Sequence, residues 1–431
     1  MKIKDKKKQT DSQGLVPKLR FPEFQDAGEW KVSPLGKKLL KCPEYGINAP
    51  AVPYSKKLPT YLRITDISED GYFIEKQKVS VAKEVIADNY LREGDIALAR
   101  TGASVGKAYR YRESDGELVF AGFLIRIRPD QKKLNTEFLI HFLSTEQYWT
   151  WVSFTSARSG QPGINGKEYA SLPVPLPPTM SEQQKIADCL SSLDQLIAAQ
   201  AHKLDTLKSH KKGLMQQLFP APGQTTPTLR FPEFRNAGEW KETALGQLGK
   251  IVSGLTYRPD DIREEGLLVL RSSNIQNGLI SLEDSVYVTP KIKGANPTKP
   301  NDILICVRNG SKSLIGKNAL IPEEMPSCTH GAFMTILRAK SAKFIFQLFQ
   351  TEIYKRHVEA DLGATINSIN STQLKKYALF IPKPDEQQKI ADCLSSLDEL
   401  IAAQAHKLDT LKAHKKGLMQ QLFPNPDEAD R

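Results

Sequence analysis

Two glycine-containing segments, each with a lysine near its end, are the residues best able to do chemistry. They read GASVGKA at 102–108 and GSKSLIGKN at 310–318. A phosphate-binding loop needs four residues between its glycines and a Ser or Thr after its lysine. The first segment has three residues between its glycines and the second has five, and neither lysine precedes Ser or Thr. Neither segment is therefore expected to bind a nucleotide in the manner of a phosphate loop.

The same two segments are suited to contact DNA. Each follows a short apolar run, and Arg, Lys, Ser, Thr and Asn side chains can reach phosphate oxygens and base edges. An ordinary hairpin turn explains the pattern equally well, so both interpretations stand. If the turns face DNA, the contacting residues are Arg100, Thr101, Ser104 and Lys107 in the first and Arg308, Asn309, Ser311, Lys312 and Lys317 in the second. Neighbouring stretches of the two halves add Arg63, Arg110, Asn165, Arg271, Asn274 and Asn367 as DNA-contacting candidates.

The sequence contains no motif for catalysis or for a metal. It lacks a Gly-x-Gly-x-x-Gly fingerprint, the Asn/Asp-Pro-Pro-Tyr/Phe motif of amino-methyltransferases and any histidine-rich cluster. Trp30 and Trp240 lie in repeated Glu-Trp-Lys triplets that superficially match a nuclease motif, but no suitable acid precedes both triplets. We interpret the two tryptophans as packing anchors. We predict that the chain has no catalytic residue, binds no metal and is not an enzyme.

Composition and charge indicate a globular protein with a polyanionic partner. Of 431 residues, 40% are hydrophobic and 25% are charged, and the excess of Lys and Arg over Asp and Glu gives a net charge of +11. This length predicts two or three folded units, and this charge favours nucleic acid as a partner. The five cysteines form no Cys-x-x-Cys pair. We therefore expect the cysteines to be reduced thiols. No apolar run reaches the ~18 residues of a membrane span, so we expect a cytoplasmic location.

Internal repeats divide the chain into two similar halves. Residues 182–220 recur at 386–424 with 37 identities in 39 positions, and residues 18–36 recur at 228–246 with 13 identities in 19. The regions between these borders have diverged, although LRITDI and LRSSNI still resemble each other. The pattern predicts two modules that share a fold and act on different targets.

The near-identical segment predicts a long coiled-coil helix in each half. Apolar residues recur at alternating spacings of four and three, which is the heptad pattern of a seam. Ser181 and Asp385 each precede a glutamine by three residues, as in a capping box, and Pro220 and Pro424 end the pattern. The polar seam residues Gln200 and Gln404 are either tolerated in an apolar seam or fix the register in which the two helices pair. The predicted seam residues are Ile186, Leu190, Leu193, Ile197, Gln200, Leu204, Leu207, Leu214 and Leu218, and Ile390, Leu394, Leu397, Ile401, Gln404, Leu408, Leu411, Leu418 and Leu422.

The diverged regions predict mixed α and β structure. Runs rich in β-branched and aromatic residues are expected to form strands at 61–67, 95–99, 118–127, 267–270, 303–307 and 332–337. Helices are expected at 134–151 and 344–358. The predicted fold class is α+β, with two mixed α/β modules joined and separated by two long antiparallel coiled-coil helices in a pseudo-two-fold repeat.

In this layout the chain resembles the specificity (S) subunit of type I restriction-modification systems. The resemblance rests on the two LRFPEF…GEWK…LG borders, the two glycine turns, the stretches GQPGINGKEYASLPVPLPP and GATINSINSTQLKKYALFIP, and the EQQKIADCLSSLD helix starts. It implies a basic flexible tail (1–17), a first target recognition domain (18–180), a central helix (181–220), a linker (221–227), a second recognition domain (228–384), a C-terminal helix (385–424) and a tail (425–431).

The resemblance also implies a function and partners. Each recognition domain would read one half of a bipartite double-stranded DNA target, and the helices would set the spacer and dock two methyltransferase (M) subunits. Restriction/translocase (R) subunits would join through that core, and S-adenosylmethionine, ATP and magnesium would be bound by partner subunits. The alternatives are recognition of DNA for another modification or phage-defence enzyme and, in a different class, a coiled-coil scaffold that binds only proteins.

Helix length predicts how far apart the half-sites lie. About 38 helical residues give a rod of roughly 57 Å. Such a rod would span about 17 base pairs, which is an upper limit because the modules reach inward from its ends. An internal two-fold would match the dyad of duplex DNA. We therefore expect two different half-sites about one helical turn apart.

Overall fold

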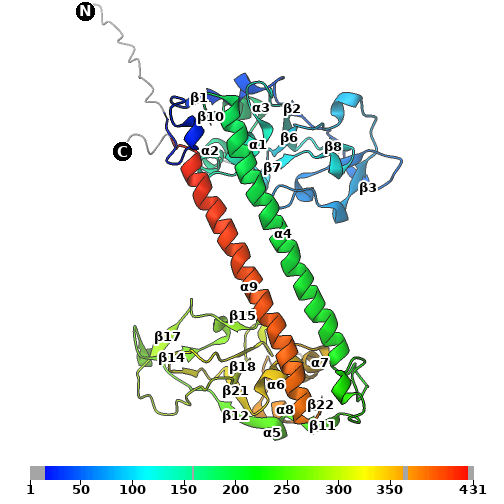
Figure 1. The fold of residues 1–431 in the computed structure, drawn as a ribbon, viewed down its shortest axis with the longest axis vertical. Coiled ribbons are helices and arrows are strands. Elements are labelled where there is room, and N and C mark those ends of the chain that lie inside the picture. The colour runs from blue at the N-terminus through cyan, green and yellow to red at the C-terminus, as the bar shows by residue number, and fades with distance from the viewer. Residues whose placement is uncertain (1–14, 158–159, 363–366, 426–431) are drawn as a thin grey trace, which may run out of the picture. The chain divides into compact units, whose positions relative to one another are not determined.

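The computed structural model describes residues 15–157, 160–362 and 367–425 (Figure 1). The chain divides into two compact units, of which unit 1 contains Met1–Gln200 and Lys407–Arg431 and unit 2 contains Ala201–His406. Each unit consists of one mixed α/β module and a part of each long helix. We name these modules module 1 and module 2. The expected tails lie outside the described residues, except for residues 15–17 and 425.

Module 1 contains two four-stranded sheets and a two-stranded ribbon. The sheets have the strand orders β2-β9-β6-β7 and β3-β5-β4-β8, and β1 pairs with β10. Strand β6 is buried along its whole length because it lies inside its sheet. The elements are β1 (Lys31–Pro34), β2 (Glu44–Tyr45), β3 (Ala51–Pro53), β4 (Thr60–Leu62), β5 (Val79–Val81), β6 (Ile96–Ala99), β7 (Ala108–Arg110), β8 (Leu118–Phe120), β9 (Leu124–Ile127), α1 (Thr136–Phe142), α2 (Glu146–Ser156), α3 (Gly166–Ser171) and β10 (Pro173–Leu176).

Module 2 repeats this topology. Its sheets have the orders β12-β21-β18-β19 and β13-β17-β14-β20, and β11 pairs with β22. The two diverged regions therefore share a fold, as their borders predicted. The elements are β11 (Lys241–Ala244), α5 (Leu245–Leu248), β12 (Gly249–Ser253), β13 (Ile262–Arg263), β14 (Leu267–Leu270), β15 (Ile275–Gln276), β16 (Leu279–Ile280), β17 (Val286–Val288), β18 (Ile303–Cys306), β19 (Asn318–Leu320), β20 (Cys328–His330), β21 (Met334–Ala339), α6 (Ala342–Phe349), α7 (Glu352–Asp361), α8 (Ser371–Lys375) and β22 (Ala378–Ile381).

Three elements expected from the sequence are divided in the structure. The strand expected at 118–127 is two strands, β8 and β9, joined by a turn in which Leu124 N donates to Ala121 O at 2.8 Å. The helix expected at 134–151 is α1 and α2, because Thr145 is extended and its side chain caps α2. The helix expected at 344–358 is α6 and α7, separated at the extended Thr351. A local turn or cap therefore overrides a continuous apolar pattern.

The two repeated segments form helices of 39 residues, α4 (Met180–Leu218) and α9 (Pro384–Leu422). The predicted capping boxes are wrong. Thr179 Oγ1 accepts from Glu182 N at 3.2 Å, so the first helix begins one residue before Ser181. The second helix begins at Pro384, because proline suits the first turn, where no backbone donor is needed.

The helices run antiparallel within each unit (Figure 1, α4 green and α9 red). In unit 1, Ile186 near the start of α4 and Leu422 at the end of α9 share one core with Trp30. In unit 2, Leu218 at the end of α4 and Ile390 near the start of α9 share a core with Trp240. Both tryptophans are thus packing anchors, as expected. Every predicted seam residue is buried or half-buried.

Candidate nucleic-acid interface

Three segments of module 1 meet at one edge, which we name turn edge 1. It consists of residues 100–101 after β6, Phe123 between β8 and β9, and residues 163–165 before α3. Arg100 N donates to Phe123 O at 3.0 Å, and Ile164 N donates to Arg100 O at 2.9 Å. Thr101 and Gly163 also form an antiparallel bridge. Backbone hydrogen bonds therefore fix the start of the first glycine turn between two other segments.

Module 2 has the same arrangement, turn edge 2, made of residues 307–309 after β18, Phe333 between β20 and β21, and residues 367–369 before α8. Phe333 O accepts from Val307 N at 3.0 Å and from Arg308 N at 3.1 Å. Ile369 N donates to Val307 O at 2.8 Å, and Arg308 forms a bridge with Ser368. The sequence-predicted turns are therefore equivalent in structure despite their unequal lengths.

One arginine at each turn edge lies over an aromatic ring. The Arg100 guanidinium carbon is 4.9 Å from the centroid of the Tyr45 ring, and that of Arg308 is 5.7 Å from the centroid of the Phe333 ring. Within the described part of the chain, neither arginine forms an ion pair. Arg100 Nε is buried, but a guanidinium stacked in this way can use its remaining donors for phosphate oxygens or base edges. These two residues are the candidates that the geometry favours most.

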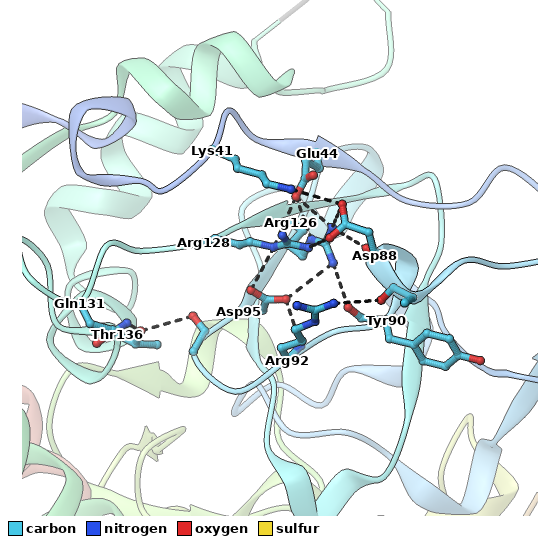
Figure 2. Close-up of polar contacts among 12 residues, drawn as sticks. Lys41, Glu44, Asp88, Tyr90, Arg92, Asp95, Arg126, Arg128, Gln131 and Thr136 are labelled. Atoms are coloured by element: carbon cyan, nitrogen blue, oxygen red, sulfur yellow. Dashed lines mark hydrogen bonds and ion pairs between the residues drawn. The ribbon is translucent and has the colours of Figure 1, made fainter.

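Figure 2 shows an ion-pair network around Arg126 on β9, the strand that pairs with β2. Arg126 on β9 is 2% exposed and donates to Glu44 Oε2 at 2.9 Å and to the carbonyls of Asp88 and Tyr90. Because Glu44 precedes Tyr45 on β2, the network positions the ring on which Arg100 lies. A hydrogen bond from Arg128 lowers the pKa of Asp88 to about 2, and burial raises the pKa of Asp95.

Four basic candidates are already paired with carboxylates. Lys107 Nζ contacts Glu69 at 3.0 Å and Arg110 contacts Glu93 at 3.0 Å, while Arg63 contacts the buried Asp66 at 2.7 Å and Arg271 contacts Asp284 at 2.8 Å. Arg110 also reaches Glu137 on α1. These contacts correct the expectation that all four side chains are available to DNA. Each side chain would have to exchange or share its acidic partner before it could contact DNA.

The asparagine candidates have structural roles. Asn274 is fully buried, and its amide donates to two backbone carbonyls, so it cannot reach DNA in this conformation. Asn165 caps α3 through a bond from Glu168 N at 3.0 Å. Asn309 donates to Ser272 Oγ and Asn367 donates to Gly310 O, which links the loops of turn edge 2.

The remaining candidates lie in the turns themselves. Thr101 precedes a 3-10 turn at 102–104 and Ser104 is its last residue; both are half-buried. Ser311 precedes a second 3-10 turn at 312–314 and Lys312 is its first residue; both are exposed, and Ser311 Oγ lies 2.9 Å from Ser313 Oγ. Lys317 is half-buried between that turn and β19.

Sequence reasoning missed the aromatic residues of both edges: Tyr45, Phe123 and Phe333. A signal for two of them was present, because AGF at 121–123 and GAF at 331–333 follow the offset of 210 residues shown by the first border repeat. Tyr45 has no comparable signal. It lies far from Arg100 in sequence, and only the sheet brings them together.

The borders form the same contacts in both units. Arg20 donates twice to Glu182 at 2.8 Å in unit 1, and Arg230 donates twice to Glu386 at 2.7 Å in unit 2. Both glutamates are 1% exposed. Beside each pair lies a surface patch made of a half-buried Phe and an exposed Glu and Lys. These border patches are Phe21, Glu23 and Lys185 in unit 1, and Phe231, Glu233 and Lys389 in unit 2.

The described residues include no cluster of three or more His, Cys, Asp or Glu side chains that could hold a metal ion. Among the helices that the structure describes, none is long and apolar enough to cross a membrane. The five cysteines form no disulfide.

Comparison with known proteins defines the class. The family model described as the type I restriction modification DNA specificity domain matches residues 58–209 and 237–413. Those two matches fall on the two modules and the helix that follows each one. The chain belongs to this family.

Individual relatives agree with this assignment. The type I restriction enzyme MjaVIII specificity subunit of Methanocaldococcus jannaschii is 24% identical over 420 residues, which cover 94% of this chain and 93% of that protein. The EcoKI specificity subunit of Escherichia coli is 30% identical over 192 residues, or 42% of this chain and 39% of that protein. The crystal structure of the type I S subunit from M. genitalium has the same fold, with a TM-score of 0.61 at 15% identity, over 95% of this chain and all of that one.

Proposed function

We propose that this chain is the sequence-specific DNA-binding specificity subunit of a type I restriction-modification complex, and that each module reads one half of a bipartite target. The observation that carries the proposal is the repetition of one fold with different side chains at the same edge. In the backbone register Arg100 lies where module 2 has Val307, and Arg308 lies where module 1 has Thr101, so each turn edge carries its arginine at a different position and over a different ring. Equivalent positions with unlike chemistry are what two readers of different half-sites require.

The long helices have two roles in this proposal. They set the spacer between half-sites, and each unit docks one methyltransferase subunit. The border patches support two copies of one partner, because identical surfaces occur in both units within segments that hardly diverged. Native mass spectrometry of the complex should reveal two methyltransferase subunits per chain at saturation, and a single bound copy would contradict the docking proposal.

The chain itself performs no chemistry in this proposal. Methyl transfer with S-adenosylmethionine, and ATP- and magnesium-dependent translocation and cleavage, belong to partner subunits. The described residues offer basic and aromatic side chains at the turn edges and no cluster of metal ligands. Robust methyl transfer by the purified chain would contradict this division of labour.

The test of DNA recognition is substitution of the exposed arginine of module 2. Arg308→Ala should remove a base contact of about 1–3 kcal/mol and relax one half-site while the other stays intact. Arg271→Ala is the matched control, because that arginine is paired with Asp284. Binding to target and scrambled duplexes across a salt titration is the measurement. Unchanged affinity and an unchanged methylation pattern in Arg308→Ala would contradict the assignment of turn edge 2.

A further inference from the structure

Each turn edge exposes one large apolar side chain at the tip of a tight turn. Phe123 is 61% exposed and Phe333 is 56% exposed. The turns are equivalent, because Leu124 N donates to Ala121 O and Met334 N donates to Gly331 O, both at 2.8 Å. Isolated exposed apolar residues are common on protein surfaces. Here, however, the same residue type recurs at the same turn of two modules whose surfaces have otherwise diverged.

Both phenylalanines are supported by buried strands and by a backbone hydrogen bond. The strands on either side, β8 and β9 in module 1 and β20 with the start of β21 in module 2, are buried. The carbonyl of each phenylalanine accepts a hydrogen bond from the backbone of the turn-edge arginine, at 3.0 Å in module 1 and 3.1 Å in module 2. Each phenylalanine is therefore presented on a rigid support that is bonded to the backbone of an arginine.

The charge beside each ring selects the partner. The Arg308 guanidinium lies over the Phe333 ring, whereas that of Arg100 lies over Tyr45 and Arg100 contacts Phe123 through its backbone. Neither arginine forms an ion pair with the described residues, so each turn edge carries uncompensated positive charge. A polyanion with apolar flat faces fits such a surface, and duplex DNA has both properties. Proteins that bend DNA insert Phe, Leu, Ile or Met between base steps, and aromatic rings also stack on bases.

We propose that Phe123 and Phe333 are DNA wedges, one for each half-site, which press against or between bases and unstack one step while the neighbouring arginine contacts the backbone or a base edge. This inference rests on the proposed function and deepens it, because it names the residue that deforms the duplex in each half-site. The specificity for each half-site would then depend on how easily that base step unstacks as well as on hydrogen bonds to the bases.

The experiment uses the full chain and its target duplex, with 2-aminopurine placed in turn at each position of each half-site. The wild-type chain should raise the fluorescence at one step in each half-site. Phe123→Ala should abolish the rise in the first half-site only, and Phe333→Ala in the second only, so each variant is the control for the other. Target affinity should fall about 5- to 150-fold, which corresponds to ~1–3 kcal/mol for one lost stacking contact.

Conservative variants separate a wedge from a loss of folding. Phe123→Leu should retain much of the fluorescence rise, because leucine also serves as a wedge. Circular dichroism and thermal melting should match the wild type, since the side chain lies outside the core. If the wild type discriminates its target from a scrambled duplex but Phe123→Ala leaves fluorescence and affinity unchanged, the wedge is wrong and DNA recognition stands. If the wild type does not discriminate, the proposed function itself fails.

Discussion

His141 in module 1 occupies the place that Gln347 has in module 2. His141 Nε2 is 3.1 Å from Ser191 Oγ, and Nδ1 is 3.7 Å from Asp194 Oδ2. Gln347 donates to Asp398 Oδ2 at 2.7 Å, and Asp194 and Asp398 are the same position of the repeated helix. Lys415 and Lys211 complete the two sites by pairing with these aspartates. One unit thus contains a titratable group where the other contains an amide.

This difference predicts a pH dependence at this position of unit 1 that the equivalent position of unit 2 lacks. Burial, together with the charge of Lys415, lowers the pKa of His141 from 6.5 to about 3. Between these values the unfolded chain binds a proton that the folded chain does not, so stability is complete above pH 6.5 and falls as the pH decreases, by roughly 1 kcal/mol per pH unit. His141→Gln should remove this dependence. Hydrogen exchange of unit 1 at pH 5 and pH 7.5 measures it, and an unchanged slope in the variant would exclude His141 as its source.

Arg126 predicts a large stability effect in module 1. It pairs with Ala97 of β6 in the strand register, and the equivalent position in module 2 is Ile336, paired with Leu304. Arg126→Met removes the buried partner of two carbonyls and leaves Glu44 and Asp95 with Arg128 alone, at 3.5 Å from each. The free energy of unfolding should therefore fall by about 3 kcal/mol, the lower end for a broken buried ion pair. Urea unfolding with hydrogen exchange should localise the loss to module 1. Glu44→Gln in the same background should recover part of it, and the absence of any loss would show that the network does not stabilise the fold.

At the residue scale, the sequence predicted where the DNA-contacting turns lie better than it predicted which side chains are available to contact DNA. The glycine turns identified Arg100 and Arg308 because their residue types and their position after a buried strand are local properties. The carboxylates that occupy Arg110 and Arg271 could not be predicted, because Glu137 and Asp284 come close only through tertiary packing. The burial of Asn274 could not be predicted either, because it too depends on tertiary packing.

At the element scale, the heptad pattern predicted the long helices within two residues of their observed ends. The pattern repeats along a single element and needs no tertiary information. The strand run at 118–127 and the two helix runs were predicted as continuous, because apolar periodicity does not reveal where Thr145 or a turn interrupts the backbone.

The helices also allow a direct test of the spacer. Inserting four residues between Gln200 and Ala201 adds about 6 Å of rise and about 40° of rotation, a stutter that coiled coils absorb. Both half-site sequences should survive, and the spacer between them should lengthen by one or two base pairs. The same insertion between Gln404 and Ala405 is the matched variant. Methylome mapping reads both changes, and an altered half-site with the original spacer would show that the helices do not set the distance.

At the scale of the whole molecule, the chain is two copies of one plan: a border, a module and a helix. The repeats made this plan visible in the sequence, and the shared sheet orders of the two modules agree with it. What the sequence does not contain is the identity of each half-site, because that depends on side chains at the turn edges and on DNA deformation.

The central claim is that each module independently reads one half-site, and a module exchange tests it most directly. Residues 247–382 are replaced by residues 37–178, so that both recognition modules have the sequence of module 1 while borders and helices remain. The chain is expressed with its methyltransferase partner, and N6-methyladenine is mapped across the host genome. We predict that the asymmetric bipartite motif becomes an inverted repeat of the first half-site with a similar spacer. A motif that keeps the original second half-site would contradict the account.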